Sequence, residues 1–134
     1  MSETNKKDYI NGPCGKVTRA RVPLSHCPKK QESEKTLEAR LRKEIEKRGG
    51  MAIKLMSQLH RGLPDRMVLM PQGVVYFVEL KSTGEKPTGL QNHCHQQLRN
   101  LGHTVYIIDS TQRLQDFLFI VDVEQLERAN APRR

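Results

Sequence analysis

The sequence predicts an α/β protein in which one mixed β-sheet is flanked by helices. Its 134 residues are enough for a single domain. Amphipathic helical patterns alternate along the chain with short apolar runs of strand type, and Gly, Pro or Ser residues separate them. The expected order is helix, three strands, helix, strand and helix. Elements in such an order pack in layers around one hydrophobic core.

The first part of the chain carries most of the positive charge and predicts no regular structure. Of the formal charge of +8, residues 1–31 contribute +5, with seven Lys or Arg against two acidic residues. This segment lacks the periods of strands and helices. We expect a basic, disordered arm at 1–31, the folded domain at 32–122 and a C-terminal tail at 123–134. The excess of positive charge also suggests a polyanionic partner.

The first helix is predicted between Ser33 and the pair Gly49-Gly50. Ser33 can cap the helix, acidic residues occupy its first turn, and the two glycines end it. The residues expected to face the core recur at every fourth position: Leu37, Leu41 and Ile45.

Three strands are predicted after this helix. A short apolar run at 51–56 is followed by a polar loop. Two further runs at 66–70 and 74–81 flank the turn sequence Pro71-Gln72-Gly73, so these two runs should form a hairpin.

A second helix, a fourth strand and a third helix are predicted in the rest of the chain. The helical pattern at 90–101 stops at Gly102, the strand is the apolar run VYIID, and Ser110 can cap the last helix. The residues of these two helices that we expect to be buried are Leu90, Cys94, Leu98, Leu101, Leu114, Phe117, Leu118 and Val121.

The sequence shows no pattern of export or membrane insertion. No apolar run approaches 18 residues, and the first ten residues lack the apolar stretch of a signal peptide. Three cysteines without a CxxC pair argue against a disulfide framework. We therefore expect a cytoplasmic protein with no membrane partner.

The strand at 74–81 ends with two opposite charges on one face. Because side chains alternate between the faces of a strand, Glu79 and Lys81 lie on the same side. Burying two ions costs several kcal/mol each, by order of magnitude, unless they are paired or bind a ligand. The pair is therefore either an ordinary ion pair where the strand leaves the core, or part of a binding site.

Asp65 favours the second interpretation. It begins the strand before the hairpin turn, so the hairpin can bring its carboxylate beside Glu79. Two close carboxylates repel each other unless a cation lies between them. Mg²⁺ suits two carboxylates, a carbonyl such as that of Leu80, and several waters. Lys81 would then lie beside the attacking water.

These residues together resemble a known family. Glu34, Pro64-Asp65, Glu79-Leu80-Lys81 and Leu90-Gln91 are similar in order and spacing to the VRR-NUC domain of the PD-(D/E)XK nuclease superfamily, including its GLPD loop and ELK strand. The similarity covers about residues 32 to 120, which makes residues 32–122 the nuclease domain. It implies a restriction-endonuclease-like fold with an α-β-β-β-α-β core and a stand-alone protein of phage or bacterial type.

The resemblance also implies a role for each of these residues. Asp65, Glu79 and the backbone carbonyl of Leu80 correspond to metal ligands. Lys81 corresponds to the catalytic lysine. The further catalytic residues it implies are Gln91 on the second long helix and Glu34 on the first, although Glu38, one turn later, is an alternative helix acid.

The implied activity is that of a metal-dependent endonuclease acting on DNA. The resemblance suggests Mg²⁺, with Mn²⁺ as a substitute, hydrolysis of phosphodiester bonds in flaps or four-way junctions, and a homodimer in a bacterial or phage-infected cell. Lys86, His93 and His95 are candidates for contacts with the substrate backbone. Two alternatives are a non-catalytic nucleic-acid-binding module on a nuclease-like fold and a basic scaffold protein.

Overall fold

The computed structural model describes residues 31–132. The expected N-terminal arm therefore lies outside the described residues, apart from Gln31. The elements follow the predicted order: α2 (Glu34–Lys47), β1 (Met51–Lys54), β2 (Arg66–Met70), the short 3₁₀ turn η2 (Pro71–Gly73), β3 (Val74–Leu80), α3 (Gly89–Asn100), β4 (Thr104–Ile108) and α4 (Thr111–Asn130).

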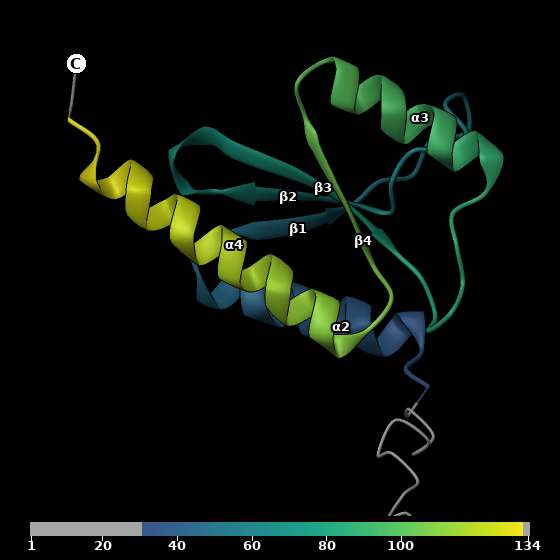
Figure 1. The fold of residues 1–134 in the computed structure, drawn as a ribbon, viewed down its shortest axis with the longest axis horizontal. Coiled ribbons are helices and arrows are strands. Elements are labelled where there is room, and N and C mark those ends of the chain that lie inside the picture. The colour runs from purple at the N-terminus through teal and green to yellow at the C-terminus, as the bar shows by residue number, and fades with distance from the viewer. Residues whose placement is uncertain (1–30, 133–134) are drawn as a thin grey trace, which may run out of the picture. The chain divides into compact units, whose positions relative to one another are not determined.

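The four strands form one mixed sheet in the order β1-β2-β3-β4. β1 and β3 both run antiparallel to β2, and the predicted hairpin pairs Met70 with Val74. β4 runs parallel to β3 after the crossover through α3. In Figure 1, α2 and α4 cover one face of the sheet and α3 covers the other. The structure thus has the predicted class, a mixed sheet flanked by helices.

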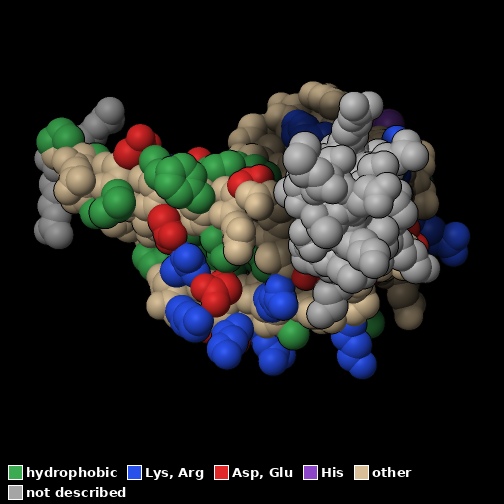
Figure 2. Space-filling view, turned by 60° about the horizontal axis from the view of Figure 1, so that its bottom comes forward, with side chains coloured by type: hydrophobic (Ala, Val, Ile, Leu, Met, Phe, Trp, Pro, Cys, Tyr) green, Lys and Arg blue, Asp and Glu red, His purple; other side chains and the backbone are tan. Residues whose placement is uncertain are grey.

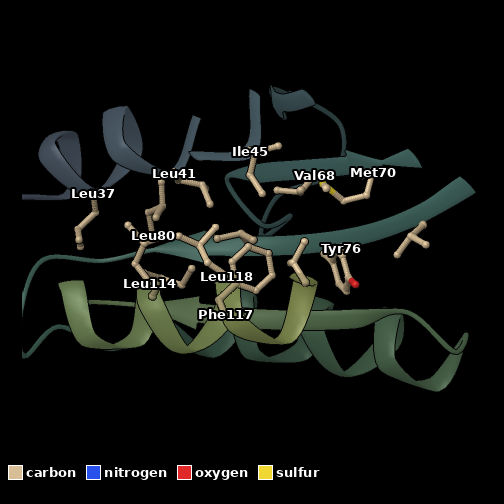
Figure 3. Close-up of a cluster of buried hydrophobic side chains, with 14 residues drawn as sticks. Leu37, Leu41, Ile45, Val68, Met70, Tyr76, Leu80, Leu114, Phe117 and Leu118 are labelled. Carbon is tan, nitrogen blue, oxygen red and sulfur yellow. The ribbon is translucent and has the colours of Figure 1, made fainter. Parts of the chain in front are cut away.

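The hydrophobic core lies between the sheet and the helices α2 and α4. Figure 3 shows Tyr76 of β3 beside Phe117 of α4, and their ring centroids are 5.5 Å apart in an edge-to-face arrangement. Alternation along β3 follows the prediction, because one set of its side chains enters this core and Glu79 points to the opposite face. The core members of β3 are Val74, Tyr76, Val78 and Leu80.

The start and end of α2 also follow from the sequence. The hydroxyl of Ser33 accepts a hydrogen bond from the backbone amide of Thr36. Gly49 has a positive φ of 77°. At Gly50 a Cβ would lie 2.7 Å from the carbonyl oxygen of Leu69 and 2.9 Å from the side chain of Ile45. Only glycine allows the chain to turn this closely against β2.

The last helix continues beyond the expected domain end. Residues 123–130, which we expected to belong to a C-terminal tail, are part of α4. Their tertiary contacts explain the difference, because Glu124 accepts a hydrogen bond from Tyr76 and Gln125 donates one to the carbonyl of Pro71. No helix of the described residues is both long and apolar enough to cross a membrane.

The buried face of α3 also differs from the prediction. Leu90 and Leu101, expected in its apolar stripe, are 53% and 76% exposed, and Cys94 and Leu98 are only partly buried. His95 is instead the one fully buried residue of the helix. α3 turns a polar face toward the sheet because a carboxylate, Glu79, occupies the sheet at that point. The leucine side of α3 lines a surface groove with residues 58–63.

We predict that Leu41→Ala destabilises the protein by about 2–5 kcal/mol, because Leu41 is completely buried and its removal leaves a cavity. Urea denaturation measures the free energy of unfolding. Leu126→Ala on the exposed side of α4 is the control and should change it by no more than about 0.5 kcal/mol. Equal effects of the two substitutions would contradict the assigned core.

Candidate active site

The GLPD loop places Asp65 directly before β2. The carbonyl oxygen of Asp65 accepts a 2.8 Å hydrogen bond from the amide of Leu55, and Pro64 is buried. Gly62 has a φ of 87°, and a Cβ there would lie 2.7 Å from the carbonyl oxygen of Leu90. Glycine is therefore needed both for the backbone conformation and for the close approach of the loop to α3.

The carboxylate of Asp65 contacts the end of β3. Its Oδ2 atom accepts a 2.9 Å hydrogen bond from the backbone amide of Leu80. β2 pairs with β3 only as far as Arg66 opposite Val78, so the amide of Leu80 has no strand partner on that side. The side chain of Asp65 supplies the hydrogen-bond acceptor that a neighbouring strand would otherwise provide. This bond brings Asp65 next to both neighbours of Leu80, which are Glu79 and Lys81.

Glu79 is fully buried, and its two oxygens differ. Oε1 accepts hydrogen bonds from Lys81 Nζ at 2.9 Å and from Gln91 Nε2 at 2.6 Å. Oε2 has no hydrogen-bond partner. Because the side chain of Glu79 is 0% exposed, the pair with Lys81 is not an ordinary ion pair at the edge of the sheet. A buried carboxylate oxygen without a partner is unfavourable unless it serves a ligand.

The charges in this cluster influence one another. Burial raises the pKa of Glu79 above its ordinary value of 4.5; the hydrogen bond from Lys81 opposes the rise, and the charge of Asp65 adds to it. For Lys81, burial lowers the pKa, but the hydrogen bond and charge of Glu79 outweigh burial and raise it above 10.5. The charges of Asp65 and Glu34 act in the same direction. Lys81 is therefore a firmly protonated ammonium group.

Gln91 is held at the first turn of α3 by a capping box. The hydroxyl of the N-cap Thr88 accepts from the amide of Gln91, and Gln91 Oε1 accepts from the amide of Thr88 at 2.9 Å. The side-chain oxygen is thus occupied, and the side-chain amide nitrogen is directed at Glu79. Helix capping and the orientation of the carboxylate depend on the same side chain.

The two candidate helix acids occupy different surroundings. Glu38 forms an ion pair with Arg66, which is itself nearly buried. Glu34 lies one turn earlier, partly exposed, and its charge contributes to the raised pKa of Lys81. Of the two acids, Glu34 is the one whose charge is among the causes of the raised pKa of Lys81.

The three candidates for contacts with the substrate differ in their exposure to solvent. Lys86 and His93 are exposed. His95 is completely buried and faces Glu79, so the expectation that it contacts the substrate backbone is wrong. Burial, followed by the charge of Arg99, lowers the pKa of His95 below its ordinary value of 6.5, so the imidazole is neutral at pH 7. Sequence periodicity missed this residue because histidine does not count toward an apolar stripe.

The cluster offers few side-chain donors to a metal. Between residues 31 and 132, no group of three or more His, Cys, Asp and Glu side chains is arranged to hold an ion. The donor set is instead two carboxylates, Asp65 and Glu79, with the strand backbone between them. The unpartnered Oε2 of Glu79 fits a cation at this point. Such an incomplete oxygen set suits an ion that keeps several waters.

The chain is similar to two known proteins. Over 77 residues the chain is 47% identical to "Putative nuclease p44" of Acyrthosiphon pisum secondary endosymbiont phage 1, an alignment that covers 58% of this chain and 83% of the phage protein. The solved structure of a "VRR_NUC domain" superimposes with a TM-score of 0.62 and 27% identity, over 65% of this chain and 96% of that one. No family model matches the chain.

We predict that Glu79→Gln stabilises the metal-free protein at neutral pH. Since the folded state holds the Glu79 proton more tightly than the unfolded chain, the contribution of Glu79 to stability is full below pH 4.5 and is lost as pH rises through its raised pKa. Glutamine carries no charge and avoids this loss. The thermal unfolding midpoint, measured in EDTA, should be higher for the variant than for the wild type at about pH 8, and not higher at about pH 4.

The control for this experiment is Glu127→Gln on the exposed surface of α4, for which we expect a small change at either pH. A variant at position 79 that is less stable than the wild type at about pH 8 would show that the ion pair with Lys81, rather than burial, dominates.

Proposed function

Because the chain belongs to the VRR-NUC nuclease family, we propose that it is a Mg²⁺-dependent endonuclease that hydrolyses phosphodiester bonds in DNA. The observation that carries the proposal is the hydrogen bond from the Leu80 amide to the Asp65 carboxylate. It joins the GLPD loop to the ELK strand and gathers one ammonium group and two carboxylates at one end of the sheet.

In this proposal Asp65, Oε2 of Glu79 and the carbonyl of Leu80 hold the ion. The N–H and C=O groups of a strand residue point to the same side, and the Leu80 amide already points at Asp65, which supports its carbonyl as the third ligand. When bound, Mg²⁺ supplies Lewis-acid polarisation of the phosphate and a more acidic water. Mn²⁺ has similar oxygen preferences and should substitute.

The other residues act on the water and on the carboxylates. Lys81 donates hydrogen bonds that position the attacking water, and its charge stabilises the negative charge that develops on the phosphate. Gln91 holds Glu79 at Oε1 and so directs Oε2 toward the ion. The charge of Glu34 adds to the raised pKa of Lys81, after the larger effects of Glu79 and Asp65.

As substrate we propose branched DNA, such as flaps and four-way junctions, in the cytoplasm of a bacterial or phage-infected cell. The likeness to a phage protein with a nuclease name supports the setting. The exposed Lys86 lies on the segment between β3 and α3, where it can reach phosphates flanking the cleaved bond, whereas His93 lines the groove between α3 and residues 58–63.

The alternative function is DNA binding without cleavage. Figure 2 shows Lys and Arg side chains gathered along one edge of the outer surface of the molecule. On α2 and at its C-cap, Arg40, Lys47 and Arg48 form ion pairs with neighbouring acids. A surface paired in this way favours a solvated helix over a DNA-binding face. The buried carboxylate of Glu79 would have no function in such a protein.

We predict that Asp65→Ala and Lys81→Ala each lower the rate of DNA cleavage by about 100-fold or more, because Asp65 is assigned to hold the ion and Lys81 to stabilise the charge that develops on the phosphate. The assay uses labelled flap, four-way junction and linear duplex DNA with Mg²⁺ or EDTA. Arg128→Ala, at the far end of α4, is the control and should cleave normally.

Two outcomes would contradict the proposal. Cleavage in EDTA, or cleavage unaffected by both substitutions, would remove the assigned site. If the wild type binds DNA in a salt-dependent way and never cuts any substrate, the binding module is the better function.

We also propose that the protein is a homodimer. The groove between α3 and residues 58–63 exposes leucines on both sides, and Leu59 is 91% and Leu101 76% exposed. Large exposed apolar side chains gathered in one place are typical of protein interfaces. A second copy that covers this groove would bury them.

The expected light-scattering mass is twice the 15.4 kDa of the chain. Leu101→Glu should lower the mass to that of one chain, because a charge would be buried in the interface. Leu126→Glu, an equally large change on the exposed side of α4, should leave the dimer intact. A wild type of monomer mass would disprove the dimer.

A further inference from the structure

His95 and Glu79 form an unusual buried pair. Within residues 31–132, three buried side-chain nitrogen or oxygen atoms have no hydrogen-bond partner, and all three belong to these two residues: Oε2 of Glu79, and Nδ1 and Nε2 of His95. Both side chains are 0% exposed, and Nε2 lies 3.6 Å from Oε2. Buried polar groups are nearly always hydrogen-bonded, so such a pair calls for an explanation.

The position of His95 on α3 makes the pairing specific. His95 follows Gln91 by four residues, so both side chains lie on the face of α3 that meets β3. Gln91 already binds Oε1 of Glu79 at 2.6 Å. His95 is next to the other oxygen, and a movement of a few tenths of an ångström would bring Nε2 within hydrogen-bond distance of Oε2.

We propose that His95 is a positioning residue, whose Nε2–H group donates to Oε2 of Glu79 and fixes the orientation of this carboxylate for metal binding. The inference rests on the proposed function, in which Oε2 is a metal-binding atom. A carboxylate oxygen has lone pairs enough to bind an ion and accept a hydrogen bond together. Metal-binding carboxylates are commonly held in this way by an outer hydrogen bond.

A neutral histidine suits this position better than a charged donor. A neutral N–H group orients the carboxylate without neutralising the charge that attracts the cation. Lys81 already supplies the ammonium group at the other oxygen.

A purely structural role for His95 makes a different prediction. If the ring only fills space between α3 and β3, an apolar side chain of similar size should serve as well. If the nitrogen is needed, glutamine should serve better, because its side-chain nitrogen lies as many bonds from the backbone as Nε2 of histidine. The two substitutions therefore separate packing from positioning.

The test is calorimetric titration of the full-length, DNA-free protein with Mn²⁺, with thermal unfolding of each variant measured in parallel. We expect His95→Leu to weaken Mn²⁺ binding by about 10- to 100-fold and His95→Gln to stay within about threefold of the wild type. Gln96→Leu, on the exposed side of α3, is the control and should bind normally. Wild-type affinity in a folded His95→Leu variant would overturn the proposal.

A second measurement needs no substitution. Nitrogen-15 NMR of the histidine rings distinguishes the two neutral tautomers, and we expect His95 to carry its proton on Nε2. A proton on Nδ1 would overturn the proposal even if the variants do not fold. The failure of the proposed function looks different, because Asp65→Ala would then leave both Mn²⁺ binding and cleavage unchanged.

Discussion

The hydrogen bond between the Leu80 amide and the Asp65 carboxylate is the contact on which the site depends. β2 stops pairing with β3 at Arg66, and the side chain of Asp65 takes over where the backbone ladder ends. The same bond satisfies an amide in the interior and carries a carboxylate to Glu79. The same hydrogen bond therefore ends the pairing of β2 with β3 and positions the carboxylate of the site.

The site places charge where folding disfavours it. Glu79 is enclosed between β3 and α3, and burial makes its charged form unfavourable even with Lys81 and Gln91 on one oxygen. The core on the opposite face of the sheet, packed with Leu, Val and aromatic residues, supplies the stability that such an arrangement needs. One face of β3 thus packs in the core and the other carries Glu79, because successive side chains of the strand point to opposite faces.

Much of the fold and most of the carboxylate site could be predicted from local patterns. The hairpin at Pro71–Gly73 and the alternation along β3 are properties of short segments, and they bring Asp65 close to Glu79. The buried face of α3 could not be predicted by periodicity, because it is set by a partner on another element. The same holds for the length of α4, which is extended by contacts with Tyr76 and Pro71.

Glu34 and Glu38 illustrate the same limit. Both are acids one helical turn apart, and the ion pair that Glu38 forms with Arg66 depends on a residue of another element.

The two contacts of Gln91 have a further consequence. Its side-chain oxygen accepts a hydrogen bond from the amide of Thr88 at the N-terminus of α3, while its side-chain nitrogen donates one to Glu79. When the first turn of α3 frays, the hydrogen bond from Gln91 to Glu79 breaks at the same time. Hydrogen exchange of the backbone amides at the beginning of α3 therefore reports how often Glu79 loses this bond.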